Sequence, residues 1–218
     1  MPKINKIRIV YVTSSAYKRE ENETFARQCV LPDGRRIDEV FEFDIRPVPI
    51  QEILNVDLAV MVAAEVISAY SQLKVPCIVE HAGLIFSEYA SRSYPGGLTK
   101  AMWDTLQDNF IEETKSAGRP AIARAVIAYC DGKQVKTFVG ERAGTIAEKP
   151  RGSRKFYWDT VFMPEDSSGR SGGLTYAEIV ENKDLGLAYK MRELSQSSAA
   201  MKEFLAYRLQ VGDPELWQ

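Results

Sequence analysis

Histidine is nearly absent from this 218-residue chain, in which His81 is the single example. The three cysteines, Cys29, Cys77 and Cys130, form no CxxC pair, so no closely spaced cysteine motif for zinc or redox chemistry is present. Their odd number and wide spacing also argue against a disulfide framework, and Cys77 and Cys130 lie in apolar runs that favour buried free thiols. We therefore expect a reducing environment, the cytoplasm.

An excess of positive charge is missing as well. Lys and Arg number 28 against 30 Asp and Glu, which leaves a net charge of −2. This balance does not favour DNA or RNA as a partner, although a local basic site for small phosphates remains open.

Long hydrophobic runs are also lacking, because the apolar-rich stretch LAVMVAAEVISAY is interrupted by Glu65. We expect neither a signal peptide nor a membrane span.

Apolar residues make up 45% of the chain and charged residues 27%, as in ordinary globular proteins. The length predicts a single domain over residues 1–218. Alternating strand and helix patterns, followed by a hairpin with DGK at its tip, predict an α/β fold with a mixed sheet. Strands are expected at 6–15, 37–45, 76–81 and in the hairpin 119–148, and helices at 18–30, 50–73, 98–110, 175–179 and 187–209.

The stretch VTSSAYK joins the first strand to the first helix. Backbone N–H groups and hydroxyls at a helix start favour an anion, and Lys18 follows one turn later, so this turn suits a phosphate. Simple capping of the helix by a serine explains the same residues.

The stretch VPCIVEHAGLIF predicts a buried strand that runs into a polar turn at Glu80 and His81. A carboxylate at such a place can hold a divalent cation or take a proton from water. Glu52 and Asp57, near the start of the second helix, can join Glu80 around Mg²⁺, which prefers oxygen ligands. Solvated loop carboxylates and ordinary acidic residues of a helix N-terminus are the alternatives.

Aromatic residues are clustered in PRGSRKFYWDTVF, where Phe156, Tyr157 and Trp158 precede Asp159. They can form a stacking wall with a hydrogen-bond acceptor for a purine ring. A plain core cluster is the alternative.

Taken in order, these stretches resemble the inosine triphosphate pyrophosphatase family, also called the Ham1/RdgB family. VTSSAYK is similar to the family's TGNxxK, PCIVEHAGL to PVxVEDxGL, and GTIAEKPRGSRKFYWDTVF to GxIxxxPRGxxxFGWDPxF. YPGGLTK, TYAE and LSQSSAAMKEF are similar to the family's PGxYxK, TxAE and SHRxxAL stretches. The resemblance runs from residue 9 to residue 205 and so covers nearly the whole chain.

The resemblance implies an enzyme that hydrolyses nucleoside triphosphates to the monophosphate and pyrophosphate, with Mg²⁺, on deaminated purine nucleotides such as ITP and XTP. It also implies a long curved mixed sheet with helices in two lobes, the active site in the cleft between them, and a homodimer. The implied catalytic residues are Glu80, His81 and Lys18, and the metal ligands Glu52, Glu80 and His81. The implied substrate-binding residues are Thr13, Ser14, Ser15, Lys18, Lys100, Phe156, Trp158, Asp159, Ser195, Gln196 and Ser197.

Two departures from the family pattern bear on activity. His81 replaces the aspartate of the metal site, where imidazole suits Mn²⁺ or Zn²⁺ better than Mg²⁺, or acts as a general base. Ser195, Gln196 and Ser197 replace Ser-His-Arg, which the family uses to contact the base. A pyrophosphatase with an altered substrate set is therefore expected. The alternatives are a catalytically impaired nucleotide-binding or sensing protein and a structural protein that kept only the fold.

Overall fold

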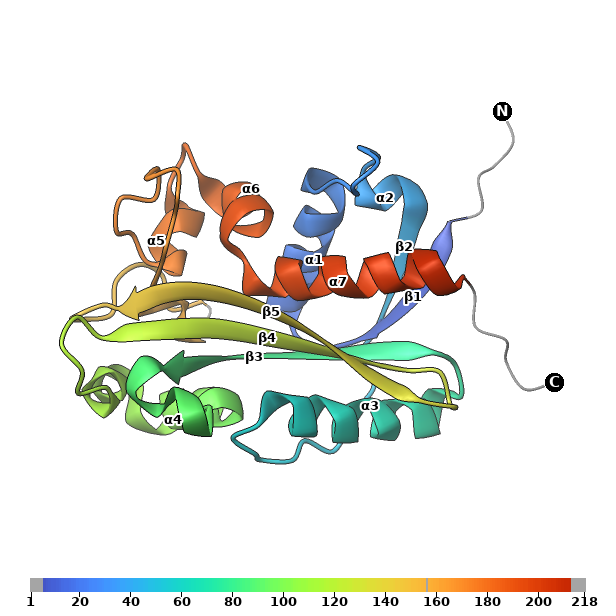
Figure 1. The fold of residues 1–218 in the computed structure, drawn as a ribbon, viewed down its shortest axis with the longest axis horizontal. Coiled ribbons are helices and arrows are strands. Elements are labelled where there is room, and N and C mark those ends of the chain that lie inside the picture. The colour runs from blue at the N-terminus through green and yellow to red at the C-terminus, as the bar shows by residue number, and fades with distance from the viewer. Residues whose placement is uncertain (1–5, 156, 213–218) are drawn as a thin grey trace.

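A long, curved sheet of six strands runs through the protein, in the order β2-β1-β3-β4-β5-β6. The computed structural model describes residues 6–155 and 157–212. Strand β1 pairs in parallel with β2 and β3, whereas β3, β4, β5 and β6 pair antiparallel, so the sheet is mixed as the sequence predicted (Figure 1). The strands are β1 (Ile7–Val12), β2 (Phe41–Arg46), β3 (Cys77–Phe86), β4 (Pro120–Cys130), β5 (Val135–Ile146) and β6 (Phe162–Pro164).

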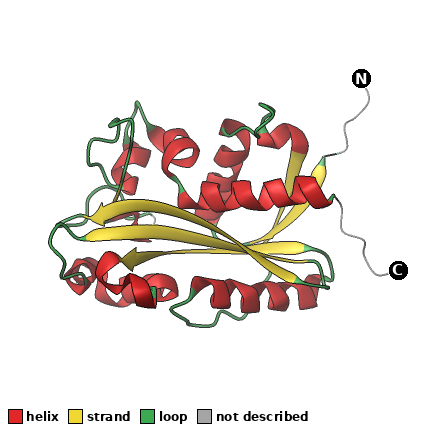
Figure 2. Cartoon of the chain, in the orientation of Figure 1, coloured by secondary structure: helices red, strands yellow, loops and turns green. Residues whose placement is uncertain are grey.

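Helices cover both faces of the sheet (Figure 2). Helices α3 and α4 lie on one face, and α1, α2, α5, α6 and α7 lie on the other. The α-helices are α1 (Ala16–Gln28), α2 (Ile37–Val40), α3 (Leu58–Leu73), α4 (Thr99–Leu106), α5 (Tyr176–Glu181), α6 (Gly186–Tyr189) and α7 (Gln196–Val211). Short 3₁₀ turns are η1 (Ser87–Arg92), η2 (Gly96–Leu98), η3 (Gln107–Glu113) and η4 (Tyr157–Thr160), and η5 (Lys190–Leu194) is a π-helical turn.

The core follows the two-residue alternation of the strands. Along β1, Ile9 and Tyr11 join the apolar cluster under α1 and α7, whereas Val10 and Val12 join the cluster under α3. The central strands are therefore buried on both faces, which explains their nearly continuous apolar sequence. All three cysteines are buried free thiols, which confirms the prediction made for Cys77 and Cys130 from their apolar runs.

The turn predicted at Glu80 and His81 is wrong, because both residues lie in the middle of the ten-residue strand β3. Their backbones continue the antiparallel ladder, in which Glu80 is paired with Ile127 and His81 with Val126. Side chains of successive strand residues point to opposite faces, so Glu80 and His81 face different helices.

The second helix begins at Leu58 rather than at residue 50. Asp57 is its N-cap, and Oδ1 of Asp57 accepts a hydrogen bond from the backbone N–H of Ala59 at 2.8 Å. Asn55 in turn accepts from the backbone N–H of Asp57, and such side-chain bonds compete with helix formation. The helix is not buried on most sides, since Val60 and Ile67 are 46% and 54% exposed.

Three further boundaries differ from the predictions. Residues 37–40, predicted as the start of a strand, form α2, and the helix predicted over 98–110 changes to the 3₁₀ turn η3 at Gln107. The helix predicted over 187–209 is interrupted at Ser195, which has an extended backbone. Ser195 Oγ accepts a hydrogen bond from the N–H of Ser198, so this serine caps a new helix instead of continuing the previous one.

Candidate active site

A cleft of about 380 Å³ opens at the carboxyl end of β1. Strands β2 and β3 lie on either side of β1, and the connections to them cross opposite faces of the sheet, which leaves a crevice at this strand end. Strand β3 continues past β1, because the two pair only through Val10–Cys77 and Tyr11–Ile78. Ten of the residues named from the sequence line the cleft: Thr13, Ser14, Ser15, Lys18, Glu52, Glu80, His81, Lys100, Tyr157 and Trp158.

The turn before α1 both caps the helix and borders the cleft. Ser15 is the N-cap, and its Oγ accepts a hydrogen bond from the backbone N–H of Lys18 at 3.3 Å. Thr13 Oγ1 accepts from the N–H of Ser15 at 3.2 Å, which holds the turn in shape. The N-terminus of this 13-residue helix therefore opens toward the cleft and favours a negative charge there.

Glu80 is buried and held by three side chains from other elements. Its Oε2 accepts a hydrogen bond from the hydroxyl of Tyr11 at 2.6 Å and lies 3.8 Å from Nζ of Lys18. Its Oε1 accepts from the hydroxyl of Ser197 at 2.7 Å, and Lys18 Nζ also donates to the Glu80 backbone oxygen. Burial raises the pKa of Glu80, but Lys18, the two hydroxyls and His81 lower it more. The net result is a pKa below the usual range, so the group is ionised at neutral pH.

His81 is on the opposite face of β3 and contacts α3. Its Nε2 lies 2.7 Å from Oε2 of Glu65, a carboxylate with no exposed surface. In the sequence, Glu65 stands out only as an interruption of an apolar run, and no role was predicted for it. An acidic residue alone within an apolar run could have indicated a buried ion pair, because a buried charge requires a partner.

The residues expected as metal ligands do not form a metal centre as they stand. Glu52 lies in the loop before α3, 4.0 Å from Nζ of Lys100, and both side chains are at least half exposed. Both oxygens of Glu80 accept internal hydrogen bonds, and Nε2 of His81 is directed at Glu65. Within residues 6–155 and 157–212, no group of three His, Cys, Asp or Glu side chains could hold a metal ion.

The aromatic segment divides between the core and the cleft. Trp158 is 3% exposed and packs edge-on against Phe162, with ring centroids 6.1 Å apart, so core packing accounts for most of its surface. Tyr157 is 37% exposed and lines the cleft, and Lys100 Nζ lies 5.8 Å from the centroid of its ring. The third aromatic residue named from the sequence, Phe156, lies outside the described residues.

Asp159 does not line this cleft but a neighbouring cavity of about 250 Å³. Its Oδ2 lies 2.5 Å from Nζ of Lys190, which also lies 2.8 Å from Oε1 of Glu21. Burial raises the pKa of Asp159 to about 6, against the opposing effect of Lys190. Burial lowers the pKa of Lys190, but the two carboxylates raise it above its usual value, so this lysine is charged. Sequence reasoning missed Lys190, because nothing near it in the chain distinguishes it from a surface lysine.

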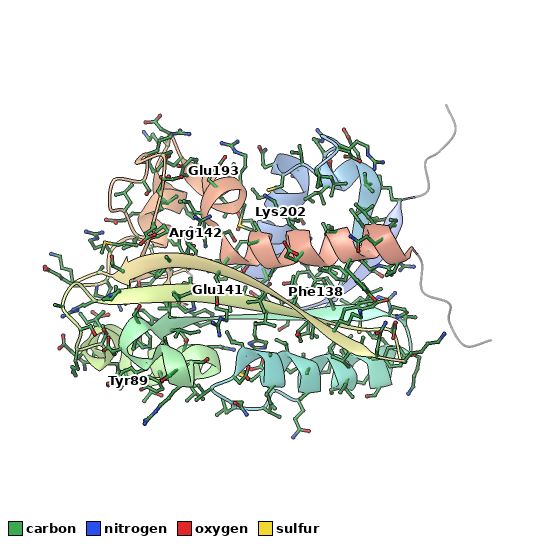
Figure 3. All side chains as sticks on the ribbon, in the orientation of Figure 1. Tyr89, Phe138, Glu141, Arg142, Glu193 and Lys202 are labelled. Atoms are coloured by element: carbon green, nitrogen blue, oxygen red, sulfur yellow. The ribbon has the colours of Figure 1, made fainter. Side chains whose placement is uncertain are left out.

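The segment that carries Lys190 is fixed to the sheet by Arg142 of β5 (Figure 3). The guanidinium of Arg142 donates to the backbone oxygens of Glu193, at 2.6 Å, and of Leu194, at 3.0 Å. These bonds satisfy carbonyl groups at the end of η5 and hold the chain where α7 begins.

Of Ser195, Gln196 and Ser197, only Ser197 reaches the cleft carboxylate. Ser195 caps α7, and Oε1 of Gln196 accepts a hydrogen bond from Tyr176 at 3.0 Å in the core. Gln196 was expected to bind substrate. Its side chain is only 4% exposed, so it is not available to the edge of a purine base. Glycine at 140 permits this packing, because a Cβ there would lie 2.1 Å from the Gln196 backbone oxygen.

Comparison with known proteins places the chain in a family. The sequence model of the Ham1 family matches residues 9–207. The chain belongs to the Ham1 family. It is 29% identical over 210 residues to the dITP/XTP pyrophosphatase of Hyperthermus butylicus, covering 94% of this chain and 97% of that protein. It is also 29% identical over 208 residues to the inosine triphosphate pyrophosphatase of Kluyveromyces lactis, covering 92% and 96% of the two chains.

The solved structure of a HAM1 protein from Coxiella burnetii superposes with a TM-score of 0.61 at 19% sequence identity. The match covers 94% of this Ham1-family chain and 98% of the Coxiella chain, which confirms the predicted fold. No helix in the described part of the chain is long and apolar enough to cross a membrane.

Proposed function

We propose that this Ham1-family protein is a nucleoside triphosphate pyrophosphatase that acts on non-standard purine nucleotides such as ITP, dITP and XTP. The observation that carries the proposal is the cleft at the end of β1, which combines a helix N-terminus, Lys18 and Lys100 with the ionised Glu80. The relatives named dITP/XTP pyrophosphatase and inosine triphosphate pyrophosphatase support the reaction and the substrate class. A nucleotide sensor without turnover is not favoured.

The cations and the anion of the cleft have separate roles in this proposal. Lys18, Lys100 and the turn at Thr13–Ser15 bind and orient the phosphates, since positive charge and N–H donors neutralise phosphate oxygens. Glu80 has lone pairs beyond those used by Tyr11 and Ser197, so it can also accept a hydrogen bond from the attacking water. Tyr157 offers an aromatic face at the cleft for the base.

Enzymes that cleave triphosphates generally use a divalent metal to neutralise the phosphates. The donor set of Glu52, Glu80 and His81 does not fit a preformed metal centre. Mg²⁺ or Mn²⁺ is proposed only as a companion of the substrate phosphates.

The substrate proposal is tested by pyrophosphate release from ITP, dITP, XTP, dUTP and the standard nucleotides, with Mg²⁺ and with Mn²⁺. We expect one of the non-standard purine nucleotides to exceed ATP and GTP by about tenfold or more in kcat/KM, a difference of ~1.4 kcal/mol. Absence of monophosphate product with every nucleotide and metal would contradict the proposal. Tight nucleotide binding without product would instead support the sensor.

The protein is further proposed to act in the cytoplasm as a homodimer of one-domain subunits. The outer face of α3 exposes Val60 and Ile67, and the loop before it exposes Leu54, which form an apolar surface suited to a second copy. Sedimentation velocity should show a dimer for the wild type and a shift toward monomer for Ile67→Arg. A wild type that stays monomeric at about 100 μM, well above ordinary dimer affinities, would rule the dimer out.

A further inference from the structure

A further cavity, of about 230 Å³, lies beside residues 8–10 of β1, away from the carboxyl end of that strand. It shares no lining residue with the cleft described above. Much of its wall is apolar and includes Ile9, Ile78 and Phe204, which come from β1, β3 and α7. The cavity is therefore separate from the place where nucleotide phosphates are proposed to bind.

The cavity lies where the sheet opens. Strand β1 pairs with β2 along its whole length, but it pairs with β3 only at Val10 and Tyr11. Pro76, the residue before β3, lines the cavity and has no backbone N–H to extend this ladder toward Arg8. The opening thus follows from the backbone pairing of the sheet, and helix α7 covers one side of it.

Three arginines from β1, β2 and α7 line this cavity, and no acidic residue is among its described lining residues. Arg208 is only 2% exposed, and its guanidinium carbon lies 5.6 Å from the ring centroid of Tyr129. Arg8 and Arg46 contact the same oxygen of Asp44, at 2.5 and 2.8 Å, so a single carboxylate serves two guanidinium groups. An arginine side chain does not lose its proton in proteins, so the positive charge at this wall does not depend on pH.

The position of Arg208 has a simpler explanation, which is incomplete. A cation in the last turn of α7 is favourable beside the helix C-terminus. That interaction requires neither a nearly complete burial of the side chain nor two more guanidinium groups at the same cavity. Burying a charge against apolar walls is costly, and a matching negative charge in the cavity offsets that cost.

We propose that this cavity binds a small organic anion, a carboxylate with an aliphatic body. The apolar wall favours removal of an aliphatic chain from water, and a carboxylate accepts paired hydrogen bonds from a guanidinium. The volume lies below the roughly 300–1,000 Å³ of pockets for drug-sized molecules, so the ligand is smaller than these. Because the cavity and the cleft have no lining residue in common, this inference is independent of the proposed function.

Calorimetric titration of the full chain with octanoate tests the ligand class. The alcohol 1-octanol supplies the aliphatic body without the charge, and inorganic phosphate supplies the charge without the body. We expect octanoate to bind at least about tenfold more tightly than either compound, because it alone uses both the apolar wall and the arginines.

Two variants locate the site. Arg208→Met removes the buried charge and keeps an unbranched side chain, whereas Val75→Phe fills the cavity and leaves all three arginines. Each should bind octanoate about tenfold more weakly or worse. The controls are Arg27→Met, which removes an exposed arginine of α1, and Ile67→Arg, which changes the exposed apolar face of α3. Both controls should bind within about twofold of the wild type, since exposed charges are screened by salt.

Circular dichroism shows whether each variant folds, and Val75→Phe, which changes no charge, decides the matter if Arg208→Met does not. Octanoate binding that either folded variant retains within about twofold overturns the inference. A wild type without heat of binding at about 1 mM octanoate overturns it as well. Equal affinity for 1-octanol or for phosphate overturns the ligand class, and an equal loss of binding in a control variant overturns the location.

Discussion

Replacing Lys190 by Met is expected to lower the free energy of unfolding by about 3–5 kcal/mol, because it leaves the buried carboxylate of Asp159 without its counter-charge. Lys190 Nζ lies 2.5 Å from Asp159 and 2.8 Å from Glu21, and the side chain is only 4% exposed. Urea denaturation at pH 8 measures the loss. The loss should shrink at pH 5, because protonation of Asp159, whose pKa is already raised to about 6, removes one uncompensated charge.

The matched control is Lys183→Met, which removes an exposed lysine a few residues earlier and should change stability by less than about 0.5 kcal/mol. A second control, Lys190→Met combined with Asp159→Asn, should recover part of the loss. Equal stability of Lys190→Met and Lys183→Met would show that the buried network contributes nothing to folding.

Replacing Lys18 by Ala is expected to reduce kcat/KM for the best nucleotide by about 10²–10³-fold, the effect of removing one group that stabilises charge in a transition state. Lys18 lies one turn into α1, where it contacts both the backbone and the carboxylate of Glu80 at the edge of the cleft. Its loss removes a cation for the phosphates and also loosens the Glu80 side chain. Steady-state pyrophosphate release measures the effect.

Arg19→Ala is the control for this prediction, since Arg19 is the next residue of the same helix but is exposed. It should retain activity within about twofold, because distant exposed charges are screened by salt. Similar losses in the two variants would assign the effect to the overall charge of α1 and not to the position of Lys18 in the cleft.

Local sequence was sufficient for the features that depend on neighbouring residues. The turn Thr13–Ser15, Lys18 and Glu80 were all named from short motifs, and the structure places them together at the cleft. Such motifs are readable because a strand end, a helix cap and the first helical turn follow one another within a few residues. The order of the motifs along the chain also predicted the family and the mixed sheet, since each motif has a fixed place in that fold.

The pairing of His81 with Glu65, and of Asp159 with Lys190, was decided only by the tertiary structure. The sequence could place an acid within an apolar helix and a histidine after a strand. It could not show their contact, because the contact depends on which face of β3 His81 occupies and on the packing of α3 against that face. The expected turn at Glu80 and His81 was wrong for the same reason, since pairing with β4 extends the strand. The role of Lys190 could not be predicted from the sequence, because its partners lie in two other segments, 31 and 169 residues away. Composition and motif order thus determined the family and the mixed sheet, whereas the docking of α3 and η5 determined which buried charges meet. A charge buried by such docking requires a partner, and only the packed chain supplies it.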